Sequence, residues 1–258
     1  MPPGVLWIAG MGLQLPPGGI VVSIGDDGLP HTEVKTPLVR LDLWATWLEI
    51  GCAHAAGAAE LADQLRSETL GDEPKGNFLS QELQQAIVAV TAFAFAFDGF
   101  YDVVRHELGQ HPDAGIWRTN RTARHKQITE TLRYHLKLGP KFTAHLGSFV
   151  EELLNFRGRA VHPSSRFVEA GWRPDIDCGV HPHFITFSGP NAVQARALAL
   201  TLLDRLLDRA RELTKPDSET GWLDTGRTVL DRLSRIYRIA GDDVLAFAED
   251  IALHQAPT

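Results

Sequence analysis

The sequence predicts an all-α fold: a helical bundle with a small β-hairpin element before it and a helical extension behind it. Apolar residues recur at intervals of three and four through most of the 258-residue chain, as on one face of an α-helix. The first 40 or so residues lack this period and consist of short β-prone pieces broken by Pro and Gly. We therefore expect a β element at 1–40, the bundle at 41–213 and the extension at 214–258.

The N-terminal half of the chain predicts one hairpin and two helices. Asp27-Gly28 lies between two β-prone pieces and is typical of a hairpin turn. The helical period then predicts a first helix over 41–65. Ser80 is a good N-cap, so a second helix is expected from there to Leu108. Its apolar run, 86–97, is too short to span a bilayer and predicts a buried helix, with no membrane segment.

The C-terminal half predicts more helices around one irregular stretch. The stretch 162–188 is rich in proline and glycine and is expected to form loops. Gly139-Pro140 is a typical helix stop, and Pro190 suits the first position of a helix. The helical periods predict helices over 120–138, 141–161, 190–213, 222–239 and 243–253.

The composition is that of an ordinary globular protein. The chain is 44% hydrophobic and 22% charged, so it can bury a sizeable core. A formal net charge of −7 argues against wholesale coating of nucleic acid but permits a local basic site. Cys52 and Cys178 are too few for a disulfide framework, and the N-terminus does not resemble a signal peptide. A reducing, cytoplasmic location is expected.

The segment LLNFRGRAVHP, residues 153–163, carries an arginine and a histidine at the end of an amphipathic helix. Arg157 and His162 resemble the R-x(4–6)-H motif of HEPN domains, a helical superfamily with many metal-independent ribonucleases. The resemblance covers about 41–213. Two other pairs share the spacing but straddle a helix end or a helix start: Arg105 with His111, and Arg118 with His125.

Two positions near the motif differ from the family pattern. Gly158 follows the arginine, where active members often have Asn, Asp or His. Ser164 stands where one subfamily, paired with nucleotidyltransferase antitoxins, has tyrosine, which argues against that subfamily.

Pro163 gives the motif histidine room to move. On an unbroken helix, His162 would lie roughly 140° around the axis from Arg157. Proline pushes the residue before it out of the α region, so the helix is expected to end near Val161. The resemblance also implies a homodimer whose two-fold axis brings the paired motifs together in one composite site.

The resemblance implies an endoribonuclease of stress response or defence that needs no metal or other cofactor. His162 would take the proton of a ribose 2′-hydroxyl, and Arg157 would stabilise negative charge on the phosphate. The products would carry a 2′,3′-cyclic phosphate. Assisting roles are expected for Arg159 and Arg166 at the phosphate, and for Asn155 and Glu151 at the imidazole.

A local basic segment favours RNA contact. Residues 116–141 contain seven Lys or Arg and one Glu. Such an excess is typical of a surface that follows an RNA backbone, and Trp117 or Tyr134 is available to stack on bases. A solvated helix face is the alternative. The candidate contacts are Arg118, Arg121, Arg124, Lys126 and Arg133.

Two other functions fit the sequence. An arginine and a histidine near a helix C-terminus also satisfy its free carbonyls, so the chain is alternatively a non-catalytic helical module that binds a protein partner. The run DIDCGVHPHF supplies Cys178, His181 and His183, which would make a three-ligand zinc site of a metal enzyme.

Overall fold

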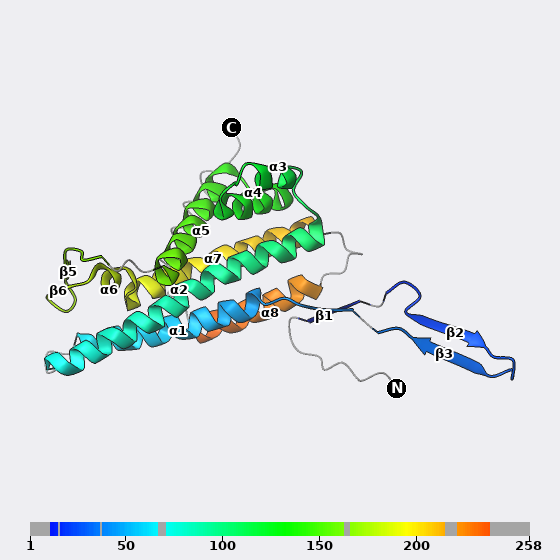
Figure 1. The fold of residues 1–258 in the computed structure, drawn as a ribbon, viewed down its shortest axis with the longest axis horizontal. Coiled ribbons are helices and arrows are strands. Elements are labelled where there is room, and N and C mark those ends of the chain that lie inside the picture. The colour runs from blue at the N-terminus through cyan, green and yellow to red at the C-terminus, as the bar shows by residue number, and fades with distance from the viewer. Residues whose placement is uncertain are drawn as a thin grey trace. The chain divides into compact units, whose positions relative to one another are not determined.

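The computed structural model describes residues 11–14, 16–36, 38–66, 71–162, 166–214 and 221–237. The chain divides into two compact units, Met1–Leu43 and Trp44–Thr258. The first is made of strands and the second is mostly helical, which confirms the predicted all-α class with a β element before it (Figure 1). The helix expected at 243–253 lies outside the described residues.

The first unit contains two antiparallel ribbons. Strand β1 (Met11–Gln14) pairs with β4 (Leu38–Leu41), and β2 (Ile20–Ile24) pairs with β3 (Pro30–Val34). Between β2 and β3 the chain turns at Gly28, whose φ of +75° favours glycine. The Asp27 carboxylate accepts a 3.0 Å hydrogen bond from the amide of Leu29. The hairpin predicted at Asp27-Gly28 is therefore confirmed.

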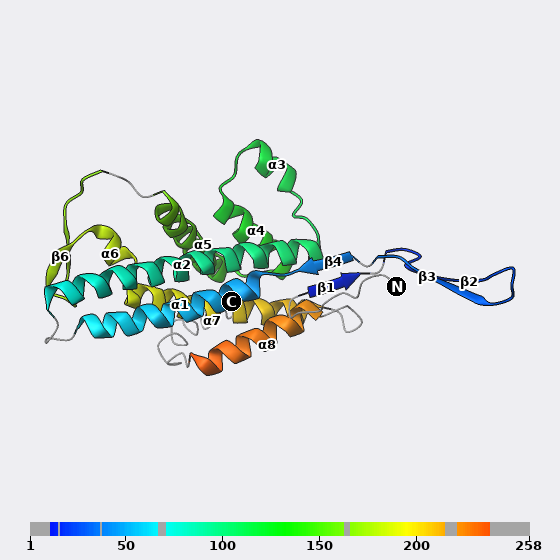
Figure 2. The same cartoon turned by 60° about the horizontal axis from the view of Figure 1, so that its bottom comes forward.

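The second unit is built on long helices (Figures 1 and 2). Helix α2 is central: it packs along α1 over the longest interface and also contacts α5, α7 and α4. Its bounds and those of the other elements are α1 Trp44–Leu65, α2 Asp72–Leu108, α3 Ala114–Thr119, α4 Arg124–Leu136, α5 Pro140–Val161, β5 Gly171–Arg173, β6 Cys178–Val180, α6 Pro182–Thr186, α7 Gly189–Leu213 and α8 Gly221–Ile236.

Aromatic side chains of α2 form the centre of the core. Phe93, Phe97 and Phe100 are fully buried. Phe100 meets Trp44 of α1 edge to face at 5.3 Å, and Phe97 meets Phe149 of α5 at 5.5 Å. Among the described helices, α2 alone is long and apolar enough to cross a membrane, but most of its apolar window is buried against neighbouring helices. The buried helix expected at 86–97 is therefore confirmed.

Helix α2 begins at Asp72, eight residues before the predicted start at Ser80. Gly71 is extended at the N-cap position, with φ −71° and ψ 169°. Pro74 lies in the first turn, where the missing amide hydrogen costs no helical hydrogen bond. The Gly and Pro that predicted a loop are therefore compatible with a helix start.

The other boundaries differ from prediction at the short elements. Helix α3 was not predicted, and the expected helix over 120–138 begins only at Arg124. The stretch expected to be irregular, 162–188, contains the β5–β6 hairpin and α6. Each of these elements has three to six residues, which is too short for a hydrophobic period to be seen.

Helix α8, at the start of the predicted C-terminal extension, shares the core of the bundle. Leu223, Leu230 and Leu233 are buried against it. A Cβ on Gly226 would lie 2.9 Å from both Leu207 of α7 and Trp44 of α1. The close approach at this glycine shows that α8 packs directly on both helices.

Candidate functional site

Helix α5 ends where the motif predicts. Its last residue is Val161, and His162 occupies the C-cap with φ −122° and ψ 64°. The His162 amide still donates to the Gly158 carbonyl at 3.0 Å, but its imidazole is exposed. Pro163 comes next in the sequence and explains the stop, because proline pushes the residue before it out of the α region. The predicted helix end is therefore confirmed.

Arg157 lies one turn earlier and is half-buried. Its guanidinium carbon is 5.9 Å from the ring centre of Phe95 on α2. Phe95 in turn contacts Trp47 of α1 at 4.9 Å. The arginine therefore caps an aromatic pair, and a guanidinium over a ring keeps in-plane N–H donors for other partners. Within the described part of this single chain, no hydrogen bond joins Arg157 to His162.

Glu151 and Asn155 do not support His162. The Oε1 atom of Glu151 lies 3.6 Å from Nε2 of His125 on α4. Glu151 shares the helical face of His162 but precedes it by eleven residues, or about 16 Å of helix at 1.5 Å per residue. Asn155 is exposed and about 10 Å away by the same measure. The expectation that these two residues orient the imidazole is therefore wrong, because residues on the same face of a helix can lie several turns apart.

Arg159 and Arg166 flank the motif on the surface. The Arg159 guanidinium carbon lies 5.8 Å from the Phe156 ring centre, and the residue is exposed on the last turn of α5. Arg166 is exposed in the segment after the helix. Their exposure is compatible with the predicted phosphate contacts.

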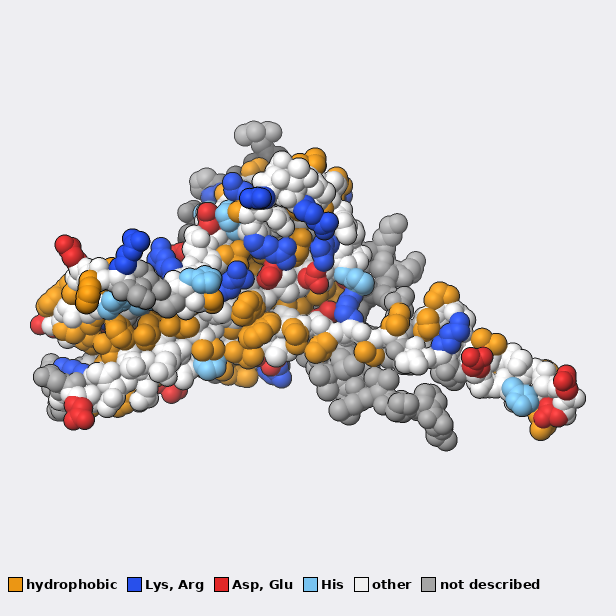
Figure 3. Space-filling view, in the orientation of Figure 1, with side chains coloured by type: hydrophobic (Ala, Val, Ile, Leu, Met, Phe, Trp, Pro, Cys, Tyr) orange, Lys and Arg blue, Asp and Glu red, His pale blue; other side chains and the backbone are white. Residues whose placement is uncertain are grey.

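Lys and Arg side chains gather over α3 and α4 in the space-filling view (Figure 3). Arg121 and Lys126 are exposed there, and Arg121 has a left-handed φ of 51°. Arg124 is different: its Nε donates to the Asp98 carboxylate at 2.6 Å, and its guanidinium lies 4.4 Å from the Tyr101 ring. Arg124 therefore joins α4 to α2 through this ion pair, and its predicted contact with RNA stays a prediction.

The aromatic residues suggested for base stacking surround a buried histidine. His111 is 5% exposed, stacks on Trp117 at 4.6 Å and meets Tyr134 edge to face at 4.7 Å. Its Nδ1 accepts a hydrogen bond from the Asp113 amide at 3.0 Å. Burial, and then the charge of His111, lower the pKa of the neighbouring His135. Trp117 and Tyr134 thus pack a local core, although Tyr134 stays 46% exposed.

The suggested zinc ligands lie on two elements: Cys178 is on β6, and His181 and His183 are at the start of α6. His181 caps α6, its Nδ1 accepting the His183 amide at 3.2 Å. Asp175, an acidic residue of the same run, pairs with Arg173 at 2.9 Å. Across the described ranges, no group of three or more His, Cys, Asp or Glu is arranged to hold a metal ion. The geometry gives the zinc alternative no support.

A buried ionic cluster, which the sequence pattern did not predict, lies between β5 and α2. Arg173 of β5, 3% exposed, forms a two-pronged ion pair with the fully buried Glu82 of α2. The guanidinium also donates to Asp175 and to the Phe184 carbonyl, so all five of its N–H donors have acceptors. Glu82 further accepts the Gly189 amide at the start of α7, at 2.7 Å. This saturated cluster joins four elements, α2, β5, α6 and α7, and its guanidinium has no donor left for a ligand.

Comparison of the chain with protein-family models, curated proteins and solved structures found no match. The resemblance to HEPN domains therefore stays a prediction that rests on the motif and the order of helices.

Proposed function

We propose that this protein is a HEPN-like, cytoplasmic, homodimeric endoribonuclease that cleaves RNA without a metal ion. The observation that carries the proposal is the end of α5: the helix stops at Val161, so the imidazole of His162 is exposed one residue beyond it. Arg157 lies five residues earlier on the same helix end.

The proposed reaction is an internal transfer at phosphorus. His162 accepts the 2′-hydroxyl proton, and the 2′-oxygen attacks the adjacent phosphate. The bond to the 5′-oxygen breaks, and that oxygen takes a proton from an imidazolium. Arg157 stabilises the charge that builds on the phosphate oxygens. The products are a 2′,3′-cyclic phosphate and a 5′-hydroxyl, and atoms balance without a co-reactant.

The geometry of one chain supports the two-fold axis proposed for the dimer. Arg157 lies against Phe95, whereas His162 is exposed beyond the helix end, so the two side chains do not meet within a protomer. A second α5 end across a two-fold axis would supply a facing imidazole and guanidinium. Exposed Arg159, Arg121 and Lys126 are the proposed contacts to the RNA backbone.

A second candidate function is favoured by the first unit. Ile20, Val22 and Ile24 of β2 are between 57% and 71% exposed. A two-stranded ribbon is marginal in water, and clustered exposed apolar side chains mark interaction surfaces. This observation favours a non-catalytic helical module that binds a protein partner through its β element.

RNA cleavage in the presence of EDTA separates the two candidates. The wild-type protein, H162A and the matched control H106A are compared on the same RNA; His106 is another exposed histidine near a helix end, on α2. The proposal predicts cleavage by wild type and H106A, and loss of at least a hundredfold in H162A, the scale of general-base catalysis. Equal cleavage by all three proteins would refute it, and circular dichroism checks that H162A remains folded.

A further inference from the structure

Helix α8 packs against α1 and α7, and its contacts fix its direction (Figure 2). Near its start, Asp224 pairs with Arg211 at 2.7 Å, close to the C-terminal end of α7. Just past its end, Tyr237 lies 4.9 Å from the guanidinium of Arg196, much earlier in α7. Helix α8 therefore runs antiparallel to α7. Arg232 pairs with Glu49 of α1, so α8 follows α1 in the same direction.

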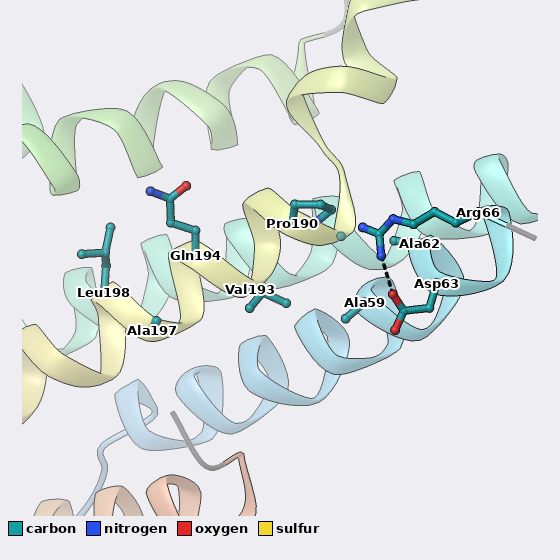
Figure 4. A pocket seen from close by; sticks show the side chains of 10 residues that line it. Ala59, Ala62, Asp63, Arg66, Pro190, Val193, Gln194, Ala197 and Leu198 are labelled. Carbon is teal, nitrogen blue, oxygen red and sulfur yellow. Dashed lines mark hydrogen bonds and ion pairs between the residues drawn. The ribbon is translucent and has the colours of Figure 1, made fainter. Parts of the chain in front are cut away.

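A groove between α1 and α7 lies beyond the end of α8. A cavity of about 690 Å³ lies between the later turns of α1 and the first turns of α7 (Figure 4). Its floor is made of small and apolar side chains, which allow a close approach of another helix. The residues that matter here are Ala59 and Ala62 of α1 and Gly189, Val193 and Ala197 of α7. The cavity therefore extends the surface on which α8 packs toward the C-terminal end of α1.

The chain after Tyr237 is long enough to reach along the cavity, and its apolar residues recur with the period of a helix. Residues 238–258 lie outside the described residues; they follow Tyr237, which lies beside Arg196 of α7, two residues from Gln194 of the cavity wall. The sequence 242–253, DDVLAFAEDIAL, repeats apolar residues at intervals of three and four. That apolar stripe consists of Val244, Phe247, Ala248 and Ile251.

We propose that residues 242–253 of the same chain occupy the cavity between α1 and α7, with the apolar stripe against its floor. Phe247 and Ile251 are large side chains, and they complement a floor in which most residues are alanine or glycine, with Val193 beside them. The connection is short: four residues, 238–241, separate Tyr237 from the segment, and they include Gly241, which permits a change of direction.

The charges of the segment 242–253 are also opposite to those at the ends of the groove. The segment has four acidic residues, Asp242, Asp243, Glu249 and Asp250, and no Lys or Arg. Two arginines lie at the ends of the groove. Arg196 is at the end nearest Tyr237, and Arg66 is at the far end, where it also pairs with Asp63 at 2.5 Å. A segment that runs in the direction of α8 would place its first carboxylates near Arg196 and its last near Arg66.

Photocrosslinking in the full-length chain tests the proposal. Benzoylphenylalanine replaces Gln194, an exposed residue of the cavity wall, and a matched control places it at the exposed Arg205 on the same helix. An equal mixture of ¹⁴N and ¹⁵N protein is irradiated, and crosslinked peptides are identified by mass spectrometry. The proposal predicts same-isotope crosslinks from position 194 to peptides within 242–253, and none from position 205.

Two outcomes of the crosslinking would overturn the proposal. Mixed-isotope crosslinks to 242–253 would mean that the groove holds the segment of a second copy. Crosslinks from position 194 that avoid 242–253 would mean that another occupant, or none, fills it. A stability measurement adds an independent check: F247D should lower the melting temperature by several degrees, whereas A246D, on the opposite face, should not. Equal melting temperatures for both variants would also contradict the proposal.

Discussion

The guanidinium of Arg173 and the carboxylate of Glu82 form a buried two-pronged ion pair, with N–O distances of 2.6 and 2.8 Å. The pair links the β5–β6 hairpin to the central helix α2. Through the Gly189 amide, Glu82 also holds the first turn of α7. One carboxylate thus positions both the hairpin and the helix that forms one wall of the α1–α7 groove.

Removal of the Glu82 carboxylate should destabilise the protein strongly. In E82A, the Arg173 charge stays buried without its main partner, which costs about 3–5 kcal/mol of unfolding free energy. Urea denaturation measures the loss. The control is D102A, which breaks the exposed ion pair of Asp102 with Arg105 and should cost at most about 1 kcal/mol. Similar losses of unfolding free energy in both variants would show that the buried cluster stabilises the fold no more than an exposed ion pair does.

Acid should weaken the same cluster through Asp175. Burial by itself would raise the pKa of Asp175, but the hydrogen bonds and charge of Arg173 outweigh it and lower this pKa below its ordinary 3.8. A lowered carboxyl pKa contributes stability above the ordinary pKa, and the contribution is lost as the pH falls through the folded-state value. Urea denaturation of wild type and D175N should therefore differ most near neutral pH and converge toward pH 3 or below. A difference in unfolding free energy that stays constant from neutral to acidic pH would contradict this prediction.

Two glycine substitutions should have opposite effects. A Cβ on Gly189 would lie 2.5 Å from the Ala58 carbonyl oxygen and 2.7 Å from the Ala62 Cβ, so G189A forces α7 away from α1. The expected cost is about 1–3 kcal/mol. Gly158, inside α5, has no neighbour within 4 Å of a Cβ, so G158A should stabilise the helix by about 0.5–1 kcal/mol. Thermal denaturation of both variants checks the signs, and destabilisation by G158A would contradict the open site.

If RNA binds over α4, the salt dependence of binding will identify the contacts. K126A removes an exposed cation from that surface and should lower the slope of log K against log salt by about one. R235A, on α8, removes an equally exposed cation far along the chain and should leave the slope unchanged. Fluorescence anisotropy with a labelled RNA at several salt concentrations measures both. An unchanged slope in K126A would remove this surface from the proposal.

The long helices could be predicted from sequence because each has several turns of apolar periodicity. The end of α5 at Val161 was also predictable, because proline restricts the residue before it. The start of α2 was not: Gly71 and Pro74 suit a loop and a helix N-terminus equally. The periodicity that reveals a helix gives no signal for elements of three to six residues such as β5 and α6.

The site was predicted only in part, because contacts between distant residues leave no local pattern. Spacing on one helix suggested that Glu151 supports His162, but the carboxylate lies beside His125 of another helix. The partner of Arg173 is 91 positions away in the sequence. One signal was available in the sequence: Glu82 precedes Ala86 and Ala89 by four and seven residues, so it lies on the apolar face of the helix, where a carboxylate is buried and requires a cation.

The chemistry of the RNA ends is the most direct test of the proposed function. RNA is incubated with wild-type protein in EDTA, and the new 3′ ends are identified by mass spectrometry, with H162A as the control. The proposal predicts 2′,3′-cyclic phosphate ends with the wild-type protein and none with H162A. Ends that carry a 3′-hydroxyl, or cyclic phosphates formed equally by H162A, would contradict a role of His162 as the base.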